Sequence, residues 1–202
     1  SAAHLAGDLG RAEEYLEGAL ASLEDLGADS RSAMATTILS EVALDRGDVE
    51  RAERLVERTA SLIDGHAGHK RAAALDRVRG RVAIERGDLG TAEATLRDAV
   101  DAARAGGFTL AEAESLTAFG AVAVERGDAA AAAERLTAAL DLGRRIESAK
   151  AVRSAAESVA DALGGEGDGR VDPEALAEAL RASPPDAIPA DSAADPTAYR
   201  AI

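Results

Sequence analysis

The chain has 202 residues, of which 37 are acidic and 23 basic, giving a formal net charge of −14 with no Cys and no Trp. The lack of Cys excludes disulfide-stapled folds and Cys-based metal or nucleophilic sites. The negative charge disfavours nucleic acid and anionic membranes as partners, and the apolar runs are shorter than the ~20 residues of a membrane span. We therefore expect a soluble, cytoplasmic, Ala-rich helical protein.

The dipeptide Gly-Asp recurs every 40 residues along the chain. It stands at residues 7–8, 47–48, 87–88, 127–128 and 167–168. Five residues after each Gly the chain has Ala12, Ala52, Ala92 and Ala132, then Asp172 in the last copy; nine residues after it stand Leu16, Val56, Leu96, Leu136 and Leu176. A fixed period of this length is typical of repeat proteins.

Each copy predicts two helices joined by a Gly-Asp turn. In the copy around residue 87, Gly87 supplies the left-handed residue that ends the first helix. Asp88 then caps the second helix through its side chain and favours its positive end. Apolar residues follow helical spacing on both sides: Leu75, Val78, Val82 and Ile84 before the turn, and Ala92, Leu96, Ala99 and Val100 after it.

Residues 75–100 resemble the tetratricopeptide repeat. Gly80 and Gly120, with Ser40 in the earlier copy, match the small residue of that family's first helix, and the Gly-Asp turn follows seven residues later. The resemblance extends over roughly residues 1–181 and implies an all-α, right-handed α-solenoid of four to five helix-turn-helix repeats. The 40-residue period exceeds the usual length of about 34 and is similar to the long repeats of maltose-regulator-like activators and kinesin light chain. An armadillo- or HEAT-like solenoid has a compatible period.

The first and last copies of the repeat are incomplete. Only residues 1–6 precede the first Gly-Asp, and the chain lacks an initiator Met, so we expect a fragment of a larger cytoplasmic protein. Asp172-Pro173 predicts that the second helix of the last copy starts late, near Pro173. The predicted repeat domain covers residues 1–182, and the Pro- and Ala-rich residues 183–202 are a tail or linker.

Three short motifs resemble functional sites, but the structure that the sequence predicts explains them without a function. Arg-Gly-Asp at Arg46, Arg86 and Arg126 falls at the predicted turns. His66 and His69 have metal-ligand spacing near Asp64, but in a Gly-rich connection. Residues 164–175 are similar to a calcium-binding EF-hand loop, yet the first and twelfth positions hold Gly164 and Ala175 instead of acidic ligands. We expect no metal and no cofactor.

No nucleophile–base pair indicates catalysis. The carboxylates fall at solvent-facing helix positions with Arg nearby, as in Glu50 with Arg54, which is typical of a solvated helix face. We expect a non-enzymatic protein.

The resemblance implies a concave groove lined by the first helix of each repeat. Its groove-facing positions in this sequence are Thr37, Glu41, Asp45, Arg77, Arg81, Glu85, Thr117, Ala121 and Glu125. Arg77 and Arg81, four residues apart, either clamp a partner's carboxylate or pair with acidic side chains of the protein itself.

The favoured hypothesis is a protein–protein interaction module that binds a peptide or helix in this groove, as part of a larger regulator. An effector-sensing domain of a regulator is the first alternative. Self-association through the truncated end repeats, giving a homo-oligomer, is the second.

Overall fold

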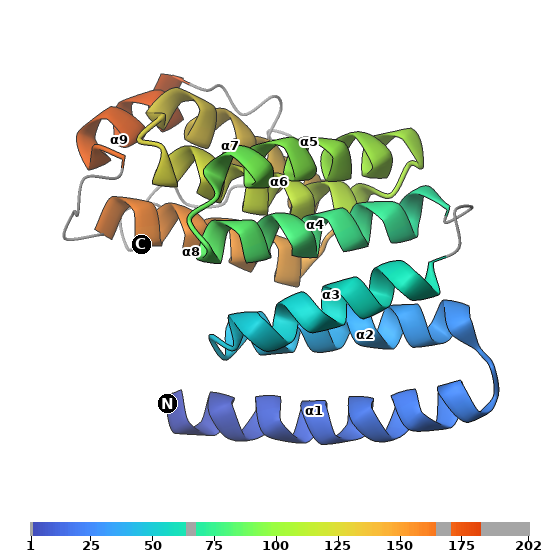
Figure 1. Cartoon of the computed structure of the whole chain (residues 1–202). Coiled ribbons are helices and arrows are strands. Elements are labelled where there is room, and N and C mark those ends of the chain that lie inside the picture. Colours follow the sequence, from blue (N-terminus) through green and yellow to red (C-terminus); the bar gives the residue numbers. More distant parts are fainter. Residues whose placement is uncertain (1, 64–67, 165–170, 183–202) are drawn as a thin grey trace. The chain divides into compact units, whose positions relative to one another are not determined.

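The computed structural model describes residues 2–63, 68–164 and 171–182 (Figure 1). These residues form helices joined by short turns, and none of them is in a strand, which confirms the predicted all-α fold. The helices are α1 (Ala2–Asp25), α2 (Asp29–Asp45), α3 (Val49–Leu62), α4 (His69–Glu85), α5 (Leu89–Ala105), α6 (Thr109–Glu125), α7 (Ala129–Arg145), α8 (Ala149–Gly164) and α9 (Pro173–Ala182). They group into two compact units, Ser1–Ala111 and Glu112–Ile202.

The 40-residue repeat contains a shorter period of 20 residues. Five helices, α2, α4, α5, α6 and α7, have 17 residues each, and three-residue turns follow them. The middle residue of each turn has positive φ: Gly27, Gly47, Gly87, Gly107, Gly127 and Glu147. The next N–H then donates to a carbonyl five residues back, as from Asp48 to Ala43 at 2.8 Å. This is the Schellman arrangement, which satisfies carbonyls at the end of a helix.

Asp occupies only every second turn because it caps the second helix of each pair. The side chains of Asp48, Asp88 and Asp128 accept backbone N–H groups of Arg51, Thr91 and Ala131 at 3.1, 3.0 and 3.0 Å. The prediction that Asp88 caps its helix is therefore confirmed. The backbone N–H and the hydroxyl of Thr91 both donate to Asp88 and hold the pKa of its carboxyl below the usual value.

The two helices of a pair approach each other closely where the first helix has Gly. A Cβ built on Gly80 would lie 2.3 Å from Cγ of Leu96, and one on Gly120 would lie 2.7 Å from Leu136. Both leucines are fully buried. The leucine of the second helix therefore sits on bare backbone of the first, and any side chain at the Gly would displace it.

Each unit has its own apolar core. In unit 1 the core between α2, α3 and α4 contains Ala43, Leu44, Ala52, Val56, Leu75, Val78 and Val82. Two buried hydroxyls join α2 and α3, since Thr59 donates to Thr36 at 2.9 Å. In unit 2 the cluster between α6, α7 and α9 contains Ala123, Ala132, Ala133, Val171 and Leu176. Nearly all of these residues are aliphatic, which explains how helices can pack in a chain with so few aromatic residues.

One predicted turn is wrong. Gly7-Asp8 lies inside α1, which runs without interruption from Ala2 to Asp25. Gly47, Gly87 and Gly127 adopt positive φ and end a helix, whereas Gly7 keeps helical backbone within α1 and therefore makes no turn. By contrast, α9 begins at Pro173 as predicted, and Asp172 accepts the N–H of Glu174 at 3.0 Å. The predicted turn at 167–168 and the tail 183–202 lie outside the described residues.

The repeat register predicts that the same substitution destabilises the protein at one alanine and is nearly neutral at another. Ala92 is fully buried, whereas Ala130 in α7 is exposed. We expect Ala92→Leu to lower the free energy of unfolding by about 1–3 kcal/mol through overpacking, and Ala130→Leu to change it by less than about 0.5 kcal/mol. Urea unfolding followed by circular dichroism measures both, and equal effects at the two sites would contradict the register.

Candidate functional site

The groove residues predicted in unit 1 lie on two neighbouring helices. Thr37, Glu41 and Asp45 follow one another at four-residue steps on α2, and Arg77, Arg81 and Glu85 do the same on α4. The two helices pack against each other. Thr37 is half-buried and donates to the carbonyl of Ala33 at 2.8 Å, whereas Glu85 is exposed.

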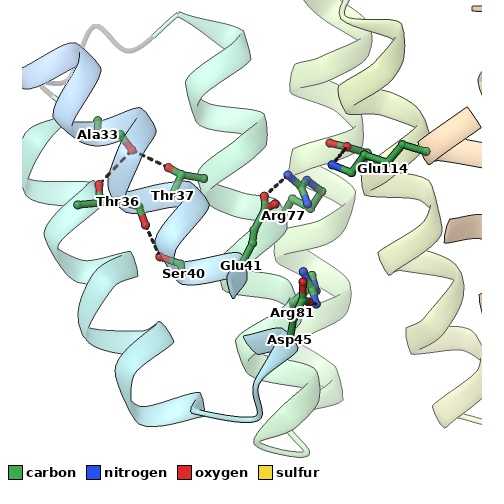
Figure 2. Close-up of polar contacts among 10 residues, drawn as sticks. Ala33, Thr36, Thr37, Ser40, Glu41, Asp45, Arg77, Arg81 and Glu114 are labelled. Atoms are coloured by element: carbon green, nitrogen blue, oxygen red, sulfur yellow. Dashed lines mark hydrogen bonds and ion pairs between the residues drawn. The ribbon is translucent and has the colours of Figure 1, made fainter. Parts of the chain in front are cut away.

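Two ion pairs connect α2 to α4 along this face (Figure 2). Arg77 pairs with Glu41, and Nη2 of Arg81 lies 2.8 Å from Oδ1 of Asp45. The first pair is mostly covered, with side chains 11% and 20% exposed, whereas the second is 32% and 49% exposed. Of the two possibilities for these arginines, the structure shows the one in which both pair with acidic residues of the protein. We name these four residues the charged ladder.

Unit 2 has an ion pair of the same kind. Nζ of Lys150 on α8 lies 2.9 Å from Oε1 of Glu114 on α6, and the two residues are 36 apart in sequence, like both pairs of the charged ladder. Of the groove residues predicted here, Glu125 is half-buried, and Thr117 is buried and donates to the carbonyl of Ala113 at 3.0 Å. Thr117 therefore offers a partner little surface.

The ion pairs have a consistent direction along the chain. In each, the acidic residue comes from the earlier helix and the basic residue from the later one; α1 and α3 add Glu13 with Arg51, Glu17 with Arg51 and Glu24 with Arg58. Sequence reasoning found the helical faces but missed these links, because it looked for pairs three or four residues apart. The signal was present as an acidic residue followed 33–38 residues later by a basic residue.

A hollow of about 460 Å³ lies between α1, α2 and α3. Leu20, Leu39 and Leu55 line it together with Arg51, Arg54 and Arg58 and the acidic Glu17 and Glu24. Arg51 and Arg58 are paired with glutamates, but Arg54 makes no ion pair among the described residues. The predicted pairing of Glu50 with Arg54 is wrong, because Glu50 turns toward Arg86 at 3.4 Å. The hollow thus joins an apolar floor to the exposed side chain of Arg54.

The other motifs found in the sequence form no cluster of metal ligands in the described part of the chain. No group of three His, Asp or Glu side chains there could hold a metal ion. His69 begins α4, while His66 and residues 165–170 of the EF-hand-like segment lie outside the described residues. Arg46 and Arg86 of the Arg-Gly-Asp motifs pair with Glu13 and with Glu53, at the ends of helices as predicted. No described helix has the length and apolarity needed to cross a bilayer.

No protein-family model matches the chain, and neither does any curated protein.

Proposed function

We propose that the protein is a non-catalytic interaction module that binds a peptide or helix of another protein over the charged ladder. The observation that supports this proposal is the exposed face shared by α2 and α4, where Arg81 and Asp45 remain accessible beside Arg77 and Glu41. A partner that carries both signs of charge can exchange one intramolecular ion pair for two intermolecular ones, which sets its orientation. The tetratricopeptide resemblance implies the same use of the first helices.

The ladder also gives the proposal a chemical constraint. Because each arginine already pairs with a carboxylate, a peptide that carries only acidic residues must displace Glu41 or Asp45 from its arginine. The displaced carboxylate loses its ion pair, and this loss weakens the binding of such a peptide. Recognition therefore favours a segment with a carboxylate and a basic group about one helical turn apart, so that all four ladder charges keep partners. Such binding weakens as salt rises, since exposed charges are screened.

Reversal of the ladder charges tests the proposal. Arg77→Glu/Arg81→Glu removes the cationic groups but also places four carboxylates together, so we compare it with a fourfold swap that adds Glu41→Arg/Asp45→Arg. The swap restores both ion pairs with opposite polarity. In pull-downs from lysate of the cells that encode the protein, we expect both variants to lose the wild-type partner by about tenfold or more.

The two variants separate binding from folding. Circular dichroism should show a helical, cooperatively unfolding swap variant, because its ion pairs are intact. A partner that is retained by the swap variant at wild-type level would contradict recognition through the charged ladder.

The hollow between α1, α2 and α3 supports effector sensing as a second candidate function. Its apolar floor and the exposed Arg54 suit a small amphiphile with an alkyl chain and a carboxylate. A ligand of the native state raises the melting temperature. We expect millimolar decanoate, at a concentration well above its dissociation constant, to raise the melting temperature by about 2 °C or more.

Arg54→Ala should abolish that rise, whereas Arg97→Ala, which removes an exposed arginine of α5 paired with Glu93 at 3.1 Å, should preserve it. An identical response of the two variants would exclude the hollow as the effector site.

A further inference from the structure

Two positions that line the hollow between α1, α2 and α3 carry a ring and an arginine in unit 2. In the 40-residue register, Phe119 of α6 corresponds to Leu39 of α2. Arg135 of α7 likewise corresponds to Leu55 of α3. The Phe119 ring is buried, and the guanidinium carbon of Arg135 lies 3.5 Å from the centre of that ring. A first and a second helix of this protein can therefore hold an aromatic ring stacked on an arginine at this register position.

In α2 and α3 the same positions have leucines, and a hollow of about 460 Å³ lies beside them. The helices α1, α2 and α3 all contribute to its lining, so its walls consist of described residues. Leu39 is itself buried, whereas Leu55 is half-buried and Ala21 of α1 is exposed. Leu55 and Ala21 thus offer most of the apolar surface that a ligand can reach.

Arginines of α3 line the hollow where α5 and α7 have no basic residue. These arginines are Arg51, Arg54 and Arg58. Their register equivalents are Thr91, Ala94 and Asp98 in α5, and Ala131, Glu134 and Ala138 in α7. The helix pairs of the repeat fold without these cations, so a cationic lining is not a requirement of the repeat.

Two of the three arginines pair with glutamates of α1. Arg51 pairs with Glu17, and Arg58 pairs with Glu24. The N–H groups that make such pairs lie in the plane of the guanidinium, so its flat faces can still stack on a ring. The third, Arg54, is exposed, and its N–H groups suit the carboxylate of a ligand.

Of the two paired arginines, Arg58 is better placed for stacking. It follows Leu55, the register equivalent of the stacked arginine in unit 2, by three residues. Because helical side chains lean toward the N-terminus of the helix, a residue at this spacing covers the surface over the preceding turn. The side chain of Arg58 is 44% exposed, so a ligand can reach it.

We propose that the hollow binds an aromatic carboxylate, with the ring beside Leu55 and stacked on Arg58, and with the carboxylate on Arg54. Such a ligand reproduces in the hollow the stack that Arg135 and Phe119 form in unit 2. Three arginines and two glutamates line the hollow, so a single negative charge on the ligand balances the charge of the lining. The site rests on the effector-sensing function proposed for the hollow and specifies the class of effector, an aromatic acid.

Two ligands of equal carbon number separate ring stacking from hydrophobic burial. 4-Phenylbutanoate and 4-cyclohexylbutanoate differ only in the saturation of the ring, and the saturated ring is the more hydrophobic. Titration calorimetry measures both dissociation constants. We expect 4-phenylbutanoate to bind about threefold more tightly, the gain typical of a cation–π contact at an exposed site. Its ring should also shift the NMR signals of the methyl groups of Leu55 and Ala21 upfield.

Variants of the arginines test their separate roles. Arg58→Lys keeps the charge that pairs with Glu24 but removes the planar face, and should reduce the preference for the aromatic ligand to less than about 1.5-fold. Arg97→Lys makes the same change at an exposed site of α5 and should leave the preference unchanged. Arg54→Ala should weaken both ligands by about fivefold or more, because the carboxylate loses its partner.

Failure of the aromatic preference and failure of the effector site give different results. Equal affinities, tighter binding of 4-cyclohexylbutanoate, or a preference that Arg58→Lys leaves unchanged would overturn the aromatic site. If Arg54→Ala still weakens both ligands in that case, effector sensing in the hollow stands. Absence of binding by both ligands at millimolar concentration, or binding that Arg54→Ala leaves unchanged, would overturn the aromatic site and the effector-sensing function together.

Discussion

The fold depends on one close contact, in which a leucine of the second helix packs on a glycine of the first, in the pairs α4–α5 and α6–α7. At Gly80 and Gly120 the leucine atoms lie where a Cβ would otherwise be. With only four aromatic residues in the chain, large side chains cannot fill wide gaps between helices. The helices must therefore approach closely, and small residues allow this. The buried alanines Ala52, Ala92 and Ala132 continue the same contact along the second helices.

Close packing of paired helices leaves the connections between them almost invariant. Five of the described helices have 17 residues and are followed by three-residue turns, and the middle residue of each of these turns is left-handed. Residues 36 apart in sequence meet between α2 and α4 in unit 1 and between α6 and α8 in unit 2, and in each ion pair there the acidic residue comes first. Ion pairs between helices thus form part of the described surface, as between Arg81 and Asp45 or between Lys150 and Glu114.

The sequence predicted what depends on the repeat register. Helix pairing, the capping role of Asp88, the burial of Ala92 and Leu96, and the late start of α9 at Pro173 were all visible in the spacing of residues. Each of these is a local or periodic property, and periodicity reports it directly.

What the sequence did not predict depends on contacts between repeats or on exceptions to the pattern. The turn at residues 146–148 escaped notice because Glu147 adopts φ of 53° where the other turns have Gly. The sequence could not show whether Arg77 pairs with Glu41 or with a carboxylate of a partner protein, because either carboxylate can accept hydrogen bonds from the same guanidinium group. Gly7-Asp8 has the sequence of a turn but remains helical within α1, because Gly permits a left-handed residue without requiring one.

A double-mutant cycle at Gly80 and Leu96 tests the central contact most directly. In an uncrowded helix, Gly→Ala stabilises by up to about 1 kcal/mol, and Gly90→Ala in α5 is the matched control, since its new Cβ would meet only Asp88 at 3.6 Å. We expect Gly80→Ala to be less favourable than Gly90→Ala by about 1–3 kcal/mol in the wild-type background, and as favourable as Gly90→Ala when Leu96→Ala is present. If Gly80→Ala and Gly90→Ala have the same effect in both backgrounds, Leu96 is not seated on Gly80 and the account of the fold is wrong.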